Sequence, residues 1–447
     1  MERKIAWEKY SQEEMEKVFA FAENYRQFLS LGKTERECVK LAVAEAKAHG
    51  YEDLQDVIAS GKTLKTGDKV YSVCMGKTLA MFQIGEEPLE NGMNIVGAHI
   101  DSPRIDLKQN PLYEDTDMAM FDTHYYGGIK KYQWVALPLA LYGVVAKKDG
   151  TTVDIAIGDD PSDPVFGISD LLPHLAREQM TKTASKIIEG EDLNLLIGSI
   201  PVKDEEKDAV KKNVLALLKE KYDIEEDDFI SAEIEVVPAG AARDYGFDRS
   251  MIMGYGHDDR VCAYPSYEAL FELGSVKRTA VCLLVDKEEI GSTGATGMTS
   301  FWFENTAAEV INACGDYSDL KVRRCLNNSR MLSSDVSAGF DPNYPSVMEK
   351  NNSSFLGKGL TFNKYTGSGG KSGSNDANAE YVALVRRIMD DANVTWQTAE
   401  LGKVDAGGGG TIAYLMAKYG MDVIDSGVPV LRMHAPWEII SKADLYE

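Results

Sequence analysis

Short runs of consecutive apolar residues, placed between helix-like segments, most constrain the fold of this chain. The clearest run is TAVCLLV (279–285), which follows the helix-like YPSYEALFELG (264–274) and precedes the helix-like TAAEVINAC (306–314). A strand without polar alternation is typical of a sheet that is buried on both faces. Strands that alternate with helices therefore predict an α/β sheet covered by helices on both sides.

The first ~60 residues are predicted to be helical. Ser11 and Glu14 have the spacing of a capping box, and apolar residues follow at helical intervals. A second helix is expected to start at Thr34 and to end at Gly50. Beyond it, DKVYSVCMGKTLAMFQIG (68–85) predicts two strands joined by a turn near Gly76.

The residue pattern changes between about residues 105 and 245, where strand-like runs are mixed with helix-like ones. Strand-like runs such as VALPLALYGVVA (135–146) and SAEIEVVPAG (231–240) surround an acidic, lysine-bearing segment, for which we expect a helix from about Lys203 to Tyr222. This stretch contains no metal-type side chains comparable to those on either side. We therefore predict a domain formed by residues 1–104 and 246–447, interrupted by an inserted β-rich domain over residues 105–245.

Composition excludes several classes of function. The net charge of −23 argues against a nucleic-acid partner, because phosphate binding needs clustered Lys and Arg. The longest apolar stretch, Trp134 to Ala146, is too short to span a bilayer, and the charged first residues do not resemble a secretion signal. The six cysteines contain no CxxC pair and are interpreted as reduced, buried thiols. These features predict a soluble cytoplasmic protein without a membrane partner.

Metal-type side chains follow the apolar runs, at the point where each predicted strand ends. In open α/β sheets, ligands bind at the carboxyl ends of the strands. A further segment, GYGHDDR (254–260), places an imidazole and two carboxylates just before a helix-like stretch. The metal-type side chains of these segments are those of His99, Asp101, His257, Asp258, Asp259, Asp286, Glu288, Glu289, Asp335 and His434. Five acidic or imidazole groups, one from each segment, are expected to meet at one edge of the sheet.

Like-charge repulsion would oppose such a cluster unless cations were bound there. Two divalent ions would remove that cost, and carboxylate and imidazole ligands without thiolates suit Zn, Mn or Co. Each motif by itself has an ordinary alternative. The pair His99 and Asp101 could be hydrogen-bonded without metal, Asp258 could cap a helix, and His434 or Asp335 could complete a strand end or a turn.

The adjacent acids Glu288 and Glu289 have a specific use. At a strand end, one of two neighbours can face the metal while the other faces the open cleft. With Glu289 as ligand, Glu288 is placed to act as general base, taking a proton from the attacking water and returning it to the departing amine. Asp101 is expected to accept a hydrogen bond from the far imidazole nitrogen of His99.

Six motifs carry a resemblance to a known family: GAHIDSPR, HYYGGIKKYQW, GYGHDDRVCAY, DKEEIGSTGATGM, SSDVSAGFDPNYP and RMHAPWE. Together they resemble the M18 metallo-aminopeptidases, the aspartyl aminopeptidase family, and most closely its bacterial branch. The resemblance implies a zinc-peptidase (phosphorylase/hydrolase-like) α/β/α domain with an inserted assembly domain. It also implies a dinuclear zinc or cobalt site and a tetrahedral dodecamer with enclosed active sites.

Carried over by residue, the resemblance gives His99, Asp258, Glu289, Asp335 and His434 as metal ligands, with Asp258 bridging both ions. Glu288 resembles the general base, with Asp101 behind His99. His174 resembles a histidine that reaches from one subunit into the active site of its neighbour, although an ordinary helix-face histidine is the alternative.

The chain departs from the aspartyl-specific members in two places. It has Asp341-Pro342 where they have His-Pro, and its segment NKYTGSGGKSGSN (363–375) is unlike their acid-recognising form. Preference for N-terminal Asp or Glu therefore does not follow. Lys364 could bind an acidic substrate side chain, or be a solvated lysine.

These features predict an aminopeptidase that releases N-terminal residues from peptides, with a metal-bridging hydroxide as nucleophile. A deacylase or other amidohydrolase with the same dinuclear site is the alternative. A nucleotide-binding scaffold is a third hypothesis, based on the glycines at 291–297 and 407–410, but neither segment fits a phosphate-binding motif.

Overall fold

Two units make up the part of the chain that the computed structural model describes, residues 4–315 and 317–447. The first unit comprises the described residues up to Asp101, together with Ala242–Met433 and Glu438–Glu447. The second comprises Ser102–Ala241 and His434–Trp437. The polypeptide therefore leaves the first unit after Asp101 and returns to it at Ala242.

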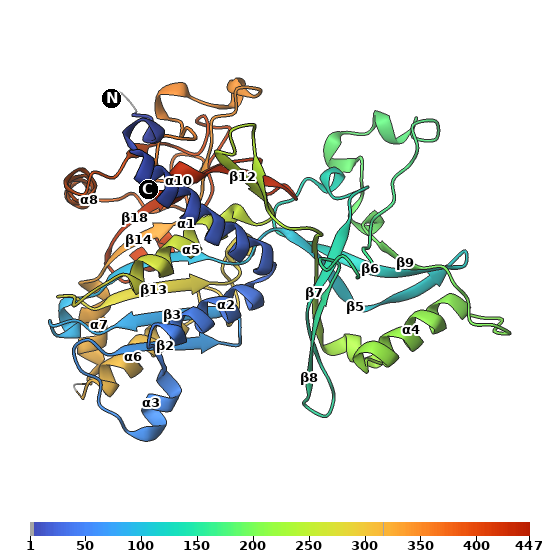
Figure 1. Cartoon of the computed structure of the whole chain (residues 1–447), viewed down its shortest axis with the longest axis horizontal. Coiled ribbons are helices and arrows are strands. Elements are labelled where there is room, and N and C mark those ends of the chain that lie inside the picture. The colour runs from blue at the N-terminus through green and yellow to red at the C-terminus, as the bar shows by residue number, and fades with distance from the viewer. Residues whose placement is uncertain (1–3, 316) are drawn as a thin grey trace. The chain divides into compact units, whose positions relative to one another are not determined.

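Within its described residues, the first unit is built on a nine-stranded mixed sheet (Figure 1). Its central strands β13, β4, β14 and β18 are mutually parallel, whereas β3 and β16 run antiparallel to the neighbours at either side of them. In spatial order the strands are β1 (Glu52–Asp53), β2 (Lys69–Cys74), β3 (Thr78–Gln83), β13 (Ala280–Val285), β4 (Asn94–His99), β14 (Arg330–Ser334), β18 (Asp422–Gly427), β16 (Leu360–Asn363) and β17 (Trp396–Thr398).

Strand β13 shows why the sheet needs helices on both faces. Cys282 and Leu284 pack into one core cluster, while Val281, Leu283 and Val285 pack into a second cluster on the opposite face. Because successive side chains of a strand point to opposite faces, a continuously apolar strand must be covered twice. The predicted α/β arrangement with helices on both faces is therefore confirmed.

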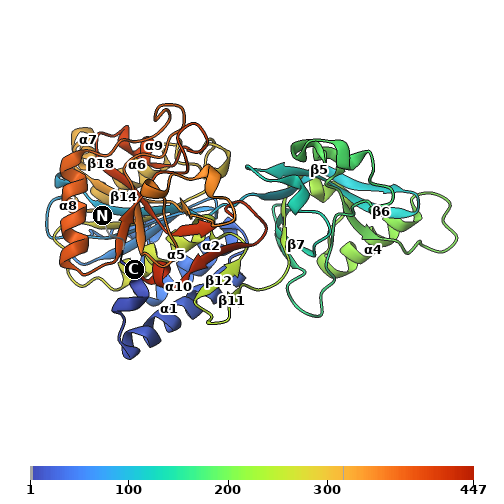
Figure 2. The same ribbon diagram turned by 90° about the horizontal axis from the view of Figure 1, so that it is seen from above.

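Two groups of helices supply that cover (Figure 2). The cluster on one face draws on α1 (Gln12–Leu31), α2 (Glu35–Ala48) and α5 (His257–Phe271). The cluster on the other face draws on α3 (Leu54–Ser60), α6 (Trp302–Ala313), α7 (Asp319–Asn327) and α9 (Ala413–Ala417). Helix α8 (Ala379–Asp391) packs against β16 and β18, and α10 (Lys442–Tyr446) ends the chain.

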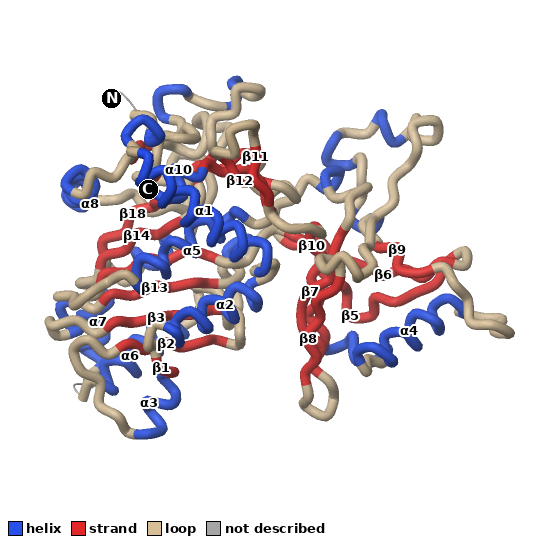
Figure 3. Tube along the Cα trace, in the orientation of Figure 1, coloured by secondary structure: helices blue, strands red, loops and turns tan. Residues whose placement is uncertain are grey.

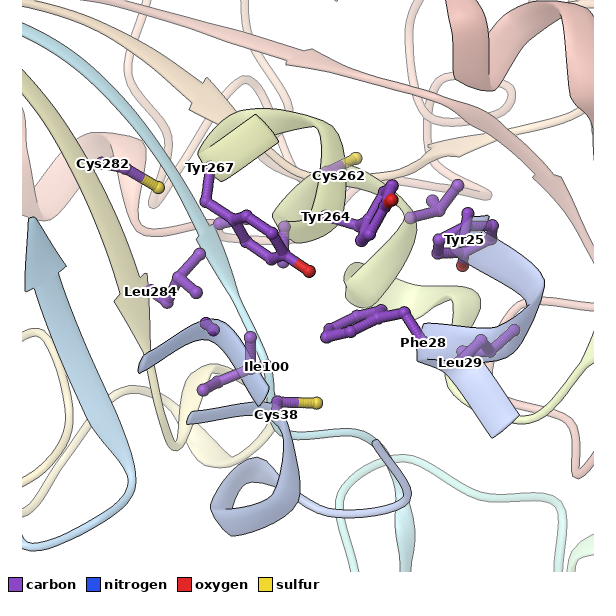
Figure 4. Packing of buried hydrophobic residues seen from close by; sticks show 14 of the residues in the cluster. Tyr25, Phe28, Leu29, Cys38, Ile100, Cys262, Tyr264, Tyr267, Cys282 and Leu284 are labelled. Carbon is purple, nitrogen blue, oxygen red and sulfur yellow. The ribbon is translucent and has the colours of Figure 1, made fainter. Parts of the chain in front are cut away.

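Aromatic side chains of α1 pack against those of α5 (Figure 4). The ring of Phe28 lies 5.2 Å from that of Tyr264, and Tyr25 lies 5.6 Å from the same ring. Tyr264 in turn meets Tyr267 edge-on at 5.3 Å. Offset and edge-to-face pairs of this kind add to the free energy gained by burial. They hold the helix that begins at His257 in a defined position on the sheet.

A second, smaller sheet belongs to the same unit. Its five strands in the described residues are β11 (Arg243–Tyr245), β12 (Met251–Gly254), β20 (Glu438–Ser441), β19 (Pro429–Leu431) and β15 (Ser337–Ala338). Strand β12 leads directly into α5, and β20 pairs with β12 in antiparallel fashion. This pairing places Glu438 beside Gly254, close to the start of α5.

The second unit is a six-stranded sheet in its described residues, antiparallel at every pairing (Figure 3). Helix α4 (Ala209–Tyr222) contacts β5, β6 and β9 of this sheet. In spatial order the strands are β8 (Thr152–Ile157), β7 (Leu139–Ala146), β10 (Ala232–Pro238), β5 (Arg104–Asp115), β6 (Met118–Tyr126) and β9 (Leu195–Gly198).

Local sequence signals located most elements near the N-terminus correctly. The capping box is present, because Ser11 Oγ accepts the Glu14 N–H at 3.3 Å and Glu14 Oε2 accepts the Ser11 N–H at 2.7 Å. The prediction that a helix starts at about Lys203 was wrong. It begins only at Ala209, after Asp208 adopts a left-handed conformation (φ +53°) that a continuing helix does not permit.

Two expectations drawn from composition can be compared with the structure. Among the described residues, no helix combines the length and the apolar composition needed to cross a bilayer. All six cysteines are free thiols, and five of them are buried. Cys282, for example, lies in the apolar cluster beneath α5. The expectation of reduced, buried thiols is therefore confirmed for five of the six.

Leu284→Ala should destabilise the first unit strongly. Leu284 is fully buried near the carboxyl end of β13, so its truncation leaves a cavity that the packed sheet cannot close. We expect a loss of about 2–5 kcal/mol in the free energy of unfolding, measured by urea denaturation. Leu320→Ala, at an exposed position of α7, is the matched control and should change it by less than about 0.5 kcal/mol.

Candidate metal centre

The polar residues at the carboxyl ends of the parallel strands β13, β4 and β14 lie at one edge of the sheet. His99 is the last residue of β4 and lies opposite Val285, the last residue of β13. Asp335 directly follows β14, which is the other neighbour of β4. Glu288 and Glu289 form the short 3-10 turn η8 (Glu288–Ile290) just beyond β13. The carboxyl edge of the sheet therefore gathers acids and an imidazole, as the sequence predicted.

Ligand-type atoms of these residues converge in two groups of three. His99, Asp258 and Asp335 can bring one atom each to within 4.8 Å of the others, and so can His99, Glu288 and Glu289. His99 Nε2 lies 3.2 Å from Asp258 Oδ1 and 3.9 Å from Glu288 Oε2. Imidazole nitrogen and carboxylate oxygen at these separations form the donor set that zinc and related divalent ions accept.

Asp101 connects the histidine to the turn that carries the two glutamates. Its carbonyl oxygen lies 2.9 Å from His99 Nδ1, and its Oδ1 lies 3.3 Å from the same nitrogen. The carboxylate also accepts the backbone N–H groups of Glu288 at 3.1 Å and of Glu289 at 3.2 Å. With Nδ1 directed at these oxygens, Nε2 of His99 is the nitrogen that faces Asp258.

The amino end of α5 presents Asp258 and Asp259. Both depart from helical backbone angles, so the regular helix starts after them. The N–H of Asp258 donates to Glu438 Oε2 at 3.0 Å, and Asp259 Oδ2 accepts the N–H of His99 at 3.3 Å. The backbone of Asp258 and the carboxylate of Asp259 are therefore each fixed by a contact with a strand, β20 and β4 respectively.

His257 belongs to the core rather than to the cluster of acids. The hydroxyl of Tyr25 donates to His257 Nδ1 at 2.7 Å, and the Nε2–H donates to the carbonyl oxygen of Ile252 at 3.2 Å. Burial lowers the pKa of His257 to about 3, so the ring is neutral at physiological pH. Both nitrogens of His257 are thus engaged within the fold, which separates this histidine from the neighbouring Asp258.

Asp286, the first acid after β13, makes a separate contact. It accepts a hydrogen bond from Thr296 Oγ1 at 2.5 Å and lies 3.5 Å from Lys287 Nζ. Burial, together with the charges of Glu35 and Asp101, raises its pKa to about 6. Asp286 is therefore held by Thr296 and Lys287.

The electrostatics of the cluster favour bound cations. Burial, followed by repulsion from Asp259 and Glu288, raises the pKa of Asp335 well above its ordinary value. Burial also raises the pKa of Asp259. For His99, burial acts to lower the pKa, but hydrogen bonds with Asp101 and Asp258 outweigh it and raise the value. The protein by itself would hold protons here, and a divalent cation would take their place.

Three further predicted residues are His434, His174 and Lys364. His434 is in the segment His434–Trp437, whose contacts assign it to the second unit, where its Nδ1 lies 2.9 Å from the carbonyl oxygen of Gly128. His174 is exposed in a turn of the second unit rather than on a helix face. Lys364 is half-exposed, with its Nζ 3.2 Å from Asp376 Oδ1. The functions predicted for these three residues stay predictions.

Some supporting residues had no signal in the sequence. Glu438, which holds the backbone of Asp258, is one of many glutamates in an acidic chain and comes from a strand 180 residues away. Tyr25, which fixes His257, lies in a helix whose apolar spacing indicated only core packing. Their contribution depends on contacts between distant segments, which residue patterns do not reveal.

The sequence of this chain matches a known protein family. Residues 28–447 match the model of the aminopeptidase I zinc metalloproteases, M18. The chain belongs to the M18 family. It is 65% identical over 447 residues to a protein of Clostridium acetobutylicum named "Probable M18 family aminopeptidase 1", covering 100% of this chain and 96% of that protein.

Solved structures agree with the family assignment. The crystal structure of aminopeptidase I from Clostridium acetobutylicum has a TM-score of 0.94 and 62% identity, covering 100% of this chain and 97% of that one. An M18 aminopeptidase from Thermotoga maritima has a TM-score of 0.95 and 46% identity, with the same coverage. A yeast structure described as the mApe1 dodecamer shares the fold at a TM-score of 0.74 and 20% identity, covering 95% of this chain and 93% of that one.

This M18 protein is therefore a metallo-aminopeptidase, and its family is one of zinc metalloproteases. The prediction of the family and of the enzyme class from six sequence motifs is confirmed. The convergence of His99, Asp258 and Asp335 shows that the chain has a donor set suited to such a metal. A nucleotide-binding scaffold is excluded as its main function.

Chelation should inactivate this M18 aminopeptidase, and zinc should restore it. Removing cations leaves Asp258 and Asp335 in mutual repulsion, so the metal-free protein should take up protons and lose stability. We expect activity on an aminoacyl substrate to fall at least ~100-fold after dialysis against chelator, with a lower melting temperature by calorimetry. Full activity after exhaustive metal removal, verified by elemental analysis, would contradict this prediction.

Proposed function

We propose that the enzyme uses a dinuclear centre with His99, Asp258, Glu289, Asp335 and His434 as ligands. The convergence of the first unit's ligand-type atoms in two groups of three, both containing His99, is the observation that supports it. Asp258 is proposed as the carboxylate shared by both ions, with Glu289 and Asp335 on opposite ions. Zinc is the proposed metal, since the family is one of zinc enzymes, with cobalt or manganese as substitutes.

His434 is included because of its position in the chain and its tautomer. It follows β19 by three residues and precedes β20 by four, and both strands belong to the first unit. Its Nδ1 is within hydrogen-bonding distance of a carbonyl oxygen, so Nδ1 carries the proton. Nε2 is then an unprotonated nitrogen, the form in which imidazole binds metal.

Bound ions would supply Lewis acidity to the scissile carbonyl group and acidify the attacking water. The chain itself would then move the proton. Glu288 is proposed to accept it at a carboxylate oxygen and to deliver it to the departing amine, which makes the base of the first step the acid of the second. The side chain of Glu288 is only partly buried, and its Oε2 is near His99, as a general base at this site requires.

Asp101 is proposed as the positioning residue for this chemistry. Its carboxylate accepts both N–H groups at the start of η8, so the proposed base Glu288 and the proposed ligand Glu289 share one anchor. The same side chain contacts the Nδ1 edge of His99. A fixed separation between base and ligand is what general-base catalysis needs, because proton transfer depends on hydrogen-bond geometry.

We propose that the enzyme recognises the free N-terminus of a peptide and that Lys364 and His174 contribute to substrate recognition. The identity of the preferred N-terminal residue depends on side chains such as Lys364. Its ion pair with Asp376 would have to open for Lys364 to bind an acidic substrate group. His174, exposed in a turn, is proposed to contribute to the active site of a neighbouring subunit.

We further propose that the enzyme is a homo-oligomer, namely a tetrahedral dodecamer built from dimers, with the unit Ser102–Ala241 as the assembly domain. The yeast relative described as a dodecamer supports this proposal. Several large apolar side chains of this unit are exposed, among them Leu171, Leu172, Leu175 and Met180. Exposed apolar groups gathered in one segment are typical of a protein contact surface.

Glu288→Gln tests the proposed base. The amide cannot take up a proton, so kcat should fall at least ~100-fold while two ions per chain remain bound. Glu289→Gln is the matched neighbour and should lower the metal content as well as the activity. Metal analysis of both variants beside initial-rate kinetics makes the distinction. Near-normal kcat in Glu288→Gln would remove Glu288 as the base, and loss of metal there would make it a ligand.

The assembly proposal predicts a particle of twelve chains. Multi-angle light scattering of the zinc-loaded enzyme should give a mass close to twelve times 49.2 kDa. Leu175→Asp with Met180→Asp should shift the mass to smaller species, because charges are costly to bury at a contact. The exposed Leu217→Asp, on α4, is the control. A monomer at micromolar concentration would contradict the assembly while leaving the metal chemistry untouched.

A further inference from the structure

An apolar groove crosses the first unit between α5 and α8. Both helices pack on the same face of the nine-stranded sheet, since α5 joins the cluster containing Leu284 and α8 joins the one containing Leu332. The strip of sheet between them is only partly covered. The resulting cavity has a volume of about 640 Å³, and its apolar lining includes Leu273, Val281, Leu332, Leu384 and Ile388.

This groove is separate from the metal centre. It reaches Asn94, the first residue of β4, and Arg330, the first residue of β14. The metal-type side chains follow the opposite ends of the same strands, at His99 and Asp335. Five residues of extended strand separate Asn94 from His99, which is about 16 Å. A molecule in the groove would therefore not contact the catalytic groups.

One end of the groove is basic. Lys277, Arg278 and Arg330 line it together with a single acid, Glu87. A second cavity of about 430 Å³ shares Glu87, Arg278 and Arg330, and the rest of its lining consists of Gly420, a second acid, Asp422, and the polar residues Asn91, Asn327, Asn328 and Ser329. Arg278 and Arg330 thus line both the apolar groove and the polar cavity beside it. In a chain with a net charge of −23, such a local excess of cations is distinctive.

Within the described residues, most N–H donors of these two arginines have no hydrogen-bond acceptor. Arg278 donates one hydrogen bond, from Nη1 to the carbonyl oxygen of Asn328 at 3.1 Å, and its Nε lies 3.9 Å from Glu87. Arg330 Nε lies 3.8 Å from Asp422 Oδ2, which is beyond hydrogen-bonding distance. A guanidinium has five N–H groups, and its planar fork matches a carboxylate.

We propose that the groove binds a single-chain aliphatic carboxylate. Its hydrocarbon chain would lie on the strip lined by Val96, Leu332 and Leu384, and its carboxylate would accept hydrogen bonds from Arg278 and Arg330. A pocket that is mostly apolar, with a few convergent polar groups at one end, is typical of such a ligand site. The proposal is independent of the proposed dinuclear mechanism, because binding is measured without turnover.

Calorimetric titration of the zinc-loaded enzyme with octanoate, 1-octanol and acetate tests the two halves of the site. Octanoate should bind saturably and at least tenfold more tightly than either of the others, because only octanoate has both the chain and the carboxylate. Absence of saturable octanoate binding would overturn the proposal. Equal affinity for octanoate and 1-octanol would overturn the function assigned to the arginines.

Variants then locate the binding. Arg278→Gln combined with Arg330→Gln should weaken octanoate at least tenfold and leave 1-octanol unchanged. Arg386→Gln, an exposed arginine on α8 that does not line the groove, is the matched control and should bind octanoate normally. Ala269→Leu, which adds volume within the groove, should weaken both ligands. Melting temperatures and aminopeptidase activity close to wild type would show that each variant is folded, and unaltered octanoate binding in all of them would overturn the assignment to this groove.

Discussion

The burial of several carboxylates at the carboxyl edge of β13, β4 and β14 is the constraint on which the rest of this structure depends. Asp258 and Asp259 are almost completely buried and Asp335 is partly buried, and their mutual repulsion opposes folding unless protons or cations are bound. A charge buried without a partner is among the most costly features a fold can contain. The sheet, its double cover of helices and the contacts behind each acid serve to hold that arrangement in place.

Rigid support comes from contacts that cross between elements. Asp101 links β4 to the turn after β13, Glu438 of β20 holds the backbone of Asp258, and Tyr25 of α1 holds His257 next to it. None of these contacts is made by neighbours in sequence. The acids therefore keep their separation because three different layers of the first unit pack tightly, not because their own loops are stiff.

The two ends of the central strands have different chemistry. At the carboxyl ends, acids and an imidazole gather around a site for cations, in agreement with the position of ligand sites in open α/β sheets. At the amino ends, where Arg330 begins β14, an incompletely covered strip of sheet meets a basic rim. We propose the first end as the site of the aminopeptidase activity of this M18 enzyme. The second has the composition of a site for an amphipathic anion, at a distance that leaves the catalytic groups untouched.

The sequence by itself determined the fold class, the capping of α1, the hairpin of β2 and β3, and the family, because these depend on local periodicity and short motifs. It also placed His99, Glu289 and Asp335 at strand ends, since an apolar run that stops at a charged residue marks such an end. It misplaced the start of α4, where a left-handed Asp208 overrides a helical composition. Only the tertiary structure decided that His257 is a core residue while Asp258 faces His99, that Glu438 and Tyr25 support them, and that a groove with two arginines lies between α5 and α8. Those outcomes depend on which distant elements pack together, and packing of that kind follows from the shape of the whole unit rather than from any local pattern.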